Sequence, residues 1–146
     1  MTVPTHVRDA AFLIARLAVG VVFIAHGWQK LATNGIDGTA AFLGQAGVPL
    51  PTLAAWVAAL VELVGGAALV LGAAVPVAAV LLVVDMIGAY LFVHAGNGVY
   101  VDQGGFELVG ALGASCLVLA AVGAGRYGVD HVISTRHKTA DDAVHA

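Results

Sequence analysis

Four helix-length apolar runs, separated by glycine, proline or polar residues, are the feature that most restricts how this chain folds. They cover about residues 10–31, 52–74, 76–95 and 106–125. About 20 mostly apolar residues in a helix cross a hydrocarbon core roughly 30 Å thick, so each run is long enough to span a membrane. The composition also indicates a membrane protein, because 60% of the residues are hydrophobic and only 10% are charged. So few charged residues could not cover the solvent-exposed surface of a soluble domain. We predict an all-α membrane four-helix bundle.

The segments outside these runs are short. Residues 39–47 (TAAFLGQAG) are too few to cross a membrane and too apolar for a free loop, which predicts a short interfacial or re-entrant helix between the first and second spans. Residues 1–9 form a polar lead. Residues 126–146 are polar and without core-forming periodicity, so we expect an exposed, flexible tail. The transmembrane domain of residues 10–125 is then the single folded unit.

Basic residues near the span ends predict the orientation. Arg8, Arg126, Arg136 and Lys138 lie on the side that both termini share in a four-span topology, while Lys30 alone marks the other side. Because the cytoplasmic loops of membrane proteins are enriched in lysine and arginine, we expect a bacterial inner-membrane protein with both termini in the cytoplasm. A net charge of -3 without a basic run gives no indication of a nucleic-acid partner.

A polar intramembrane cluster is predicted from three charged residues inside the apolar runs, Arg16, Glu62 and Asp85. An arginine in hydrocarbon costs roughly 2.5 to 3.5 kcal/mol on insertion scales, so we expect Arg16 to meet one of the two carboxylates inside the bundle. Gly66 and Gly88 follow the two carboxylates by four and three residues, which predicts closely packed helix faces there. Two interpretations stay open: ion pairs that only fix the helix register, or a polar cavity or proton path.

A second polar group is expected near the outer membrane boundary. Tyr90 and His94 share one helical face, and a histidine can donate a hydrogen bond to a carbonyl oxygen, so the group could hold a quinone headgroup. His26 and His94 could instead ligate a haem iron from two helices, but the chain has no CxxCH motif, so we favour the quinone and expect no metal site. Alternatively, these residues only anchor the helices among lipid headgroups. The candidate residues are His26, Gln29, Lys30, Tyr90, His94 and Glu107.

Four segments in this order resemble the DoxX family of small four-span bacterial membrane proteins: RLAVGVVFIAHGWQKL, FLGQAGVPLP, ELVGGAALVLG and GGFEL. The resemblance covers about residues 11–125 and implies a four-helix membrane bundle. Some members resemble a subunit of thiosulfate:quinone oxidoreductase, and others are associated with oxidative stress and thiol-redox partners. The single cysteine, Cys116, leaves no cysteine pair, which speaks against thiol chemistry by this chain itself. The positions that match the family's motifs are His26, Gly27, Lys30, Pro49, Glu62, Gly65, Gly66 and Glu107.

Together these features predict the membrane subunit of a redox-associated complex rather than a stand-alone enzyme. Its polar intramembrane site would bind a quinone headgroup or relay protons. The alternative is a non-enzymatic lipid or small-molecule binder or carrier, with residues 39–47 as a lid, or a membrane scaffold whose buried charges are only ion pairs. The expected partners are the lipid bilayer and other membrane or peripheral redox proteins. Abundant glycine and alanine faces also favour a homo-oligomer.

Overall fold

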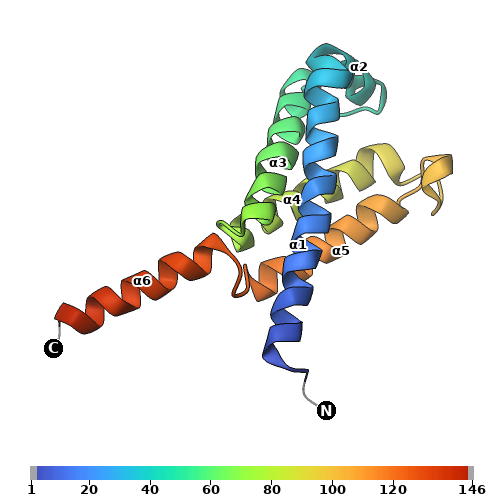
Figure 1. The fold of residues 1–146 in the computed structure, drawn as a ribbon. Coiled ribbons are helices and arrows are strands. Elements are labelled where there is room, and N and C mark those ends of the chain that lie inside the picture. The colour runs from blue at the N-terminus through green and yellow to red at the C-terminus, as the bar shows by residue number, and fades with distance from the viewer. Residues whose placement is uncertain (1–2, 145–146) are drawn as a thin grey trace.

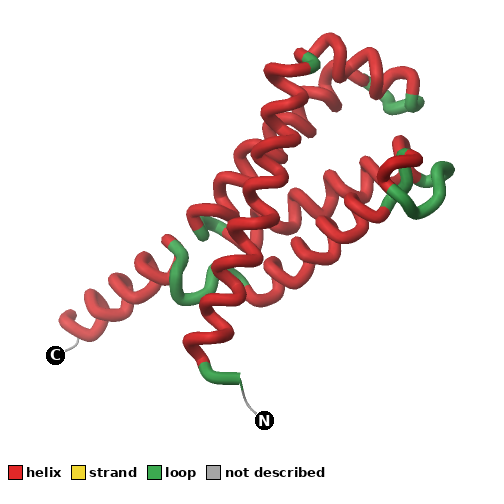
Figure 2. Tube along the Cα trace, turned by 45° about the vertical axis from the view of Figure 1, so that its right-hand side comes forward, coloured by secondary structure: helices red, strands yellow, loops and turns green. Residues whose placement is uncertain are grey.

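The computed structural model describes residues 3–144, and this part of the chain forms helices joined by turns and loops, with no β-strand (Figure 2). The helices are α1 (Thr5–Trp28), α2 (Gly35–Gln45), α3 (Pro51–Leu71), α4 (Val75–Ala89), α5 (Glu107–Val122) and α6 (Val129–Val144). Three shorter helical turns are η1 (Gln29–Thr33) after α1, η2 (Tyr90–His94) after α4, and η3 (Val101–Gln103) before α5; η1 and η2 are π-helical. The predicted all-α fold is confirmed, with a short helix between the first two spans.

Three helical segments are long and apolar enough to cross a membrane: Thr5–Thr33, Pro51–Leu71 and Val75–His94. The fourth apolar helix, α5, has 16 residues and therefore rises about 24 Å. It is shorter than the fourth span that we predicted and ends at a glycine with a positive φ of 80°, Gly123. The first helix begins at Thr5, inside the segment that we assigned to the polar lead. The spanning helices place the chain in contact with a lipid bilayer.

The spanning helices pack as two pairs, α1 against α3 and α4 against α5 (Figure 1). The short turn between α3 and α4 joins the pairs, and the buried core beside it includes Leu69, Val75, Leu82 and Leu119. Away from this turn the two pairs diverge, and α2 packs on α3 at the far end. The divergence leaves space between α3 and α4 that the core side chains do not fill.

Glycines bring α1 and α3 into close contact. A Cβ atom on Gly66 would lie 2.7 Å from the carbonyl oxygen of Gly20, and a Cβ on Gly27 would lie 2.7 Å from the backbone nitrogen of Leu63. Small residues at such crossings let helix backbones approach in a membrane. The prediction of a packed face is therefore right for Gly66, but it is wrong for Gly88, where an added Cβ would have no atom within 4 Å.

The C-terminal segment, for which we expected an exposed, flexible tail, contains a helix. Residues 129–144 form α6, which runs away from the bundle at an oblique angle to α1 (Figure 1). The expected exposure is present, because the side chains of residues 131–136 are all exposed. Judging the segment by its polarity alone missed a helical repeat of apolar residues that begins at Val129.

Candidate functional site

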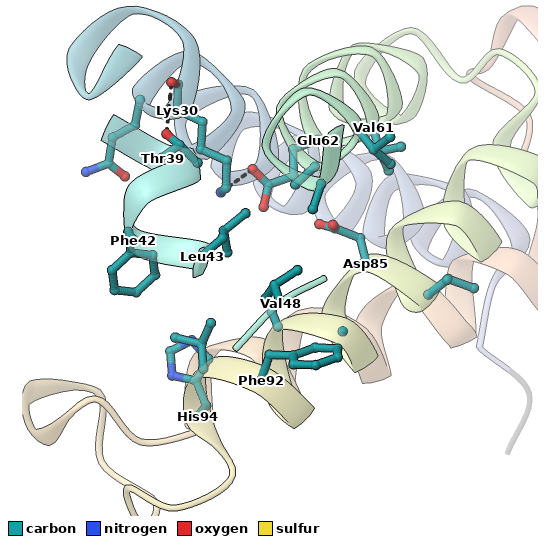
Figure 3. A pocket seen from close by; sticks show the side chains of 18 of the residues that line it. Lys30, Thr39, Phe42, Leu43, Val48, Val61, Glu62, Asp85, Phe92 and His94 are labelled. Atoms are coloured by element: carbon teal, nitrogen blue, oxygen red, sulfur yellow. Dashed lines mark hydrogen bonds and ion pairs between the residues drawn. The ribbon is translucent and has the colours of Figure 1, made fainter. Parts of the chain in front are cut away.

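A cavity of about 520 Å³ occupies the space between α3 and α4, with α2 and η1 at one end and η2 beside it (Figure 3). We call it the central pocket. Its walls are mostly apolar side chains from α2, α3 and α4, among them Leu43, Val57 and Val84. A mainly apolar cavity with a few converging polar groups is typical of small-molecule sites. Its polar lining residues are Gln29, Lys30, Asn34, Thr39, Glu62, Asp85 and His94.

An ion pair between Lys30 and Glu62 forms one wall of the central pocket. The Lys30 ammonium donates a hydrogen bond to Glu62 Oε2 over 2.5 Å. The Glu62 side chain is only 5% exposed and the Lys30 side chain 23%, so the pair is largely removed from solvent. Lys30 belongs to η1, and π-helical turns occur frequently at functional sites. The close approach of α1 to α3 at Gly27, one turn before Lys30, brings the two side chains together.

Asp85 adds a second carboxyl group to this pair. It projects from α4 toward Glu62 across the pocket and lies within electrostatic reach of both Glu62 and Lys30 (Figure 3). We call Lys30, Glu62 and Asp85 the carboxylate cluster. It carries one negative charge when both carboxyl groups are ionised, and it is neutral when they hold one proton. The cluster can therefore take up or release a proton while the Lys30–Glu62 pair stays in place.

Hydrogen bonds hold α2 over the end of the central pocket. The Thr39 hydroxyl lies 2.9 Å from the carbonyl oxygen of Gly35 and 3.1 Å from that of Lys30, and it can donate to either. The first turn of α2 is thereby tied to the backbone of η1, beside the ion pair. Phe42 on this anchored helix and Phe92 of η2 both line the central pocket, one on each side of it (Figure 3).

The ring of His94 is oriented by the loop that precedes α5. Its Nδ1 atom lies 2.6 Å from the carbonyl oxygen of Gly104. Because a carbonyl oxygen only accepts, Nδ1 carries the hydrogen of this bond. In the neutral ring Nε2 is then an acceptor, and His94 lines the central pocket. A ligand hydroxyl group in the pocket could therefore donate a hydrogen bond to Nε2 of His94.

The sequence prediction identified some of the pocket residues and missed others. Five candidates line the central pocket: Gln29, Lys30, Glu62, Asp85 and His94. We had placed them in two separate groups at different depths. The missed polar residues, Asn34 and Thr39, follow the first span, and Thr39 lies in the short segment that we expected to cover a pocket. The prediction that this segment covers a pocket was the one sequence signal that pointed to Thr39.

Three further candidates lie outside the central pocket. The Tyr90 ring packs edge to face against Phe106 with ring centroids 5.6 Å apart, and it borders a smaller groove between α4 and α5. Glu107 Oε1 accepts a hydrogen bond of 2.8 Å from the backbone N–H of Val101. His26 is half-buried in α1 and does not line the pocket that His94 lines. Within residues 3–144 the structure contains no cluster of His, Cys, Asp or Glu suited to a metal ion.

Arg16 lies at the other end of the molecule. It is fully buried and donates hydrogen bonds to two backbone carbonyl oxygens, 2.5 Å to Ala124 and 3.1 Å to Tyr127. The predicted pairing of Arg16 with Glu62 or Asp85 is therefore wrong. About 21 Å of helical rise separates Arg16 from Lys30, which stands beside those carboxylates. The guanidinium meets carbonyl groups after the end of α5 instead of a carboxylate.

The surroundings of Arg16 fasten α6 to the turn between α3 and α4. The Asp130 carboxylate accepts hydrogen bonds from the backbone N–H groups of Ala74 (2.7 Å) and Val75 (3.1 Å), which caps the start of α4. The Asp130 N–H donates to the Gly72 carbonyl oxygen over 3.0 Å. A side chain on Gly72 would overlap the Arg16 guanidinium. We call this arrangement the Arg16 junction; it connects α1, α4 and α6.

Comparison with known proteins places this architecture in a family. The family model DoxX matches residues 11–95. The chain belongs to the DoxX family. It is 31% identical over 128 residues to "Inner membrane protein YphA" of Escherichia coli (strain K12). The aligned residues cover 84% of this chain and 90% of that protein. It is also 37% identical over 81 residues to "Putative oxidoreductase CatD" of Bacillus subtilis (strain 168), covering 56% of this chain and 58% of that protein. No solved structure matches the chain.

The DoxX match and the central pocket cover the same part of the chain. All residues that line the pocket lie between Gln29 and His94, inside the matched residues 11–95. The carbonyl partners of Arg16 and the capping residue Asp130 lie outside the match. The apolar helices and the inner-membrane relative together identify a multi-pass protein of the bacterial inner membrane. The candidate site of this DoxX protein is thus the central pocket.

Proposed function

We propose that the central pocket binds the headgroup of a lipid-soluble quinone and that the carboxylate cluster exchanges protons with it. The observation that carries the proposal is the position of a desolvated Lys30–Glu62 pair and a second carboxyl group, Asp85, on the wall of a pocket that is otherwise mostly apolar. Intramembrane ionisable residues frequently mark ligand sites and proton paths. The chain would act as the membrane subunit of a redox-associated complex.

Access to the pocket is expected from within the bilayer. Several of its lining side chains are also among the exposed apolar residues of the chain, including Val57, Leu81 and Val84. In a spanning protein such side chains contact lipid tails. A molecule with an apolar tail can therefore enter sideways, with its polar end toward the carboxylate cluster.

The chemistry of a quinone suits the polar groups that it would meet. Reduction to the quinol adds two electrons and two protons, and each carbonyl oxygen becomes a hydroxyl group. The Lys30 ammonium can donate a hydrogen bond to a quinone oxygen, and the carboxyl pair can supply the two protons one at a time, taking up a proton from water after each transfer. Electrons would come from a partner redox protein of the complex. The word "oxidoreductase" in the name of the relative from Bacillus subtilis supports a redox role.

The distribution of basic residues supports an orientation for this site. Exposed Arg8, Arg126 and Arg136 lie toward the end of the molecule that carries the Arg16 junction. Under the positive-inside rule that end, with both termini, faces the cytoplasm. The central pocket then opens in the outer half of the membrane, and its partner would contact the outer ends of the helices or the lipid-facing surface.

A substitution that fills the central pocket tests this function. Gly88 lines the pocket and a Cβ there meets no atom within 4 Å, so the side chain of Gly88→Leu has space to enter and should occupy part of the ligand space. The matched control is Gly38→Leu on α2, where the only neighbour is the Asn34 Cβ at 3.9 Å and the residue does not line the pocket. Each purified protein is incubated with a short-chain ubiquinone analogue, and the quinone retained per protein is quantified by extraction and mass analysis.

The wild type and Gly38→Leu should retain the quinone analogue in a saturable way, and Gly88→Leu should lose it. Circular dichroism and size-exclusion chromatography show whether both variants keep the fold. Equal retention by all three proteins would contradict a site in the central pocket. A wild type that retains phospholipid but no quinone would replace the proposal with the second function, a lipid binder or carrier.

A further inference from the structure

Helix α6 carries an apolar stripe that no part of the described chain covers. Val129, Val132 and Ile133 are spaced as neighbours on one helical face, and 42%, 49% and 49% of their surfaces are exposed. The same register continues through positions 140, 143 and 144, which are alanine, alanine and valine. The residues between them are polar or charged. An amphipathic helix with this pattern requires an apolar environment along one side only.

The position of α6 indicates which environment that is. Its first turn is fixed by Asp130 to the turn between α3 and α4, at the end of two spanning helices. From there α6 runs away from the bundle, at an oblique angle to α1 (Figure 1). It starts near the membrane boundary where the spanning helices end, so its apolar stripe can reach the bilayer surface there.

The lipid-facing surface of the spans continues onto α6. Leu71 at the end of α3, Val77 in the first turns of α4 and Tyr127 just before α6 are all exposed, as lipid-contacting residues are in a spanning protein. The apolar stripe of α6 begins directly after Tyr127. A bilayer that surrounds the spans therefore reaches the start of this stripe.

Two arginines on this side can contact lipid phosphates, although the sequence of α6 as a whole has three aspartates against one arginine and one lysine. Arg126 precedes α6, and Arg136 stands one turn after Val132 on the side of the apolar stripe; both are exposed. Arginine can place its aliphatic part along an apolar surface while its guanidinium reaches lipid phosphates. The one carboxylate in the first turn, Asp130, is used in the cap of α4.

We infer that α6 lies in the headgroup region of the bilayer that the protein spans, with its apolar stripe inserted and its basic residues on anionic phospholipids. This assignment is independent of the proposed quinone site. Amphipathic helices with basic residues and an apolar face bind membrane surfaces in this way. The helix then fixes the depth of the adjacent span ends through the Arg16 junction.

The test places one fluorescent label on each side of α6 in the full chain. The native thiol is removed by Cys116→Ala, and a single cysteine is introduced by Ile133→Cys or, as the matched control, Ser134→Cys, and labelled with bimane. Both residues are exposed, and the Ser134 hydroxyl bonds only within α6, to the His131 carbonyl oxygen. The proteins are reconstituted into vesicles of equal parts phosphatidylcholine and phosphatidylglycerol, and circular dichroism checks their helix content.

The label at position 133 should show a blue-shifted emission, quenching by a nitroxide on the upper acyl chain and little quenching by aqueous iodide. The label at position 134 should show the reverse. Equal iodide quenching at both positions would overturn the inference. Protection at position 133 that disappears when protein is diluted in lipid would assign the stripe to a second copy and also overturn it. In vesicles of phosphatidylcholine alone the nitroxide quenching should fall; an unchanged value would refute the anionic lipid contact.

Discussion

The contact between α1 and α3 at Gly27 connects the stability of the bundle to the geometry of the site. A Cβ atom on Gly27 would lie 2.7 Å from the backbone nitrogen of Leu63 and 2.9 Å from the carbonyl oxygen of Ala59. Both are backbone atoms of α3 and cannot rotate away as a side chain can. Gly27→Ala should therefore push α1 away from α3 one turn before Lys30, and so widen the distance to Glu62.

The size of the effect follows from this overlap and from a matched substitution. Ordinary contacts begin near 3.4 Å, so the new methyl group would overlap Leu63 by about 0.7 Å. Overpacking of this kind typically costs ~1 to 3 kcal/mol. Alanine also favours a helix over glycine by roughly 0.5 to 1 kcal/mol. Gly88→Ala receives that gain without an overlap, so Gly27→Ala should be less stable than Gly88→Ala by ~1 to 3 kcal/mol.

The free energies of unfolding can be compared by titrating each variant from mild detergent into sodium dodecyl sulfate and following the helix content by circular dichroism. Gly88→Ala should be at least as stable as the wild type. Gly27→Ala should be less stable and should also retain less of the quinone analogue, because Lys30 moves relative to Glu62. If Gly27→Ala were as stable as Gly88→Ala, the close helix contact that holds the carboxylate cluster together would be refuted.

Two other substitutions test the roles of the carboxylate cluster and of the Arg16 junction separately. Asp85→Asn keeps the size of the side chain but removes a titratable group, so the variant should still retain the quinone analogue while the rate of proton uptake on its reduction, followed with a pH dye in weak buffer, decreases; an unchanged rate would remove Asp85 from the proton path. Arg16→Lys should lower the free energy of unfolding by ~1 to 3 kcal/mol, because one ammonium group cannot replace the planar fork that reaches both Ala124 and Tyr127. Quinone retention should not change; a stability equal to that of the wild type would contradict the role of the fork.

The membrane fold was predictable from the sequence because apolar run length is a strong signal. A helix that crosses hydrocarbon must satisfy its own backbone hydrogen bonds, and few other structures can use such runs. The formation of α6 was not predicted, since this segment is polar on average. The spacing of Val129, Val132 and Ile133 is that of one helical face, but we judged the segment by its polar composition and therefore expected a flexible tail.

The residues of the candidate site were predicted as separate groups because they lie on different helices. Glu62 and Asp85 were found from their cost in an apolar run, and Lys30 was assigned to the membrane boundary from its position along the helix. The length of the lysine side chain, which lets it reach Glu62, does not enter such an estimate of depth. Arg16 was misassigned because only carboxylates were considered as partners. Carbonyl groups left free where a helix ends also accept hydrogen bonds from a guanidinium.

The difference between Arg16 and Asp85 bears on whether the buried charges are only structural. Arg16 donates to two carbonyl acceptors that fix the chain after α5, and Asp130 lies within electrostatic reach of its guanidinium. Lys30 and Glu62 neutralise one another, and that ion pair alone would be sufficient for a purely structural role. Asp85 then adds a carboxyl group that among the described residues has no cation of its own, at an insertion cost of ~2.5 to 3.5 kcal/mol near the centre of a span. The proposed proton exchange gives this group a role beyond that of the Lys30–Glu62 pair, and the Asp85→Asn measurement decides between that role and a structural contact with Glu62.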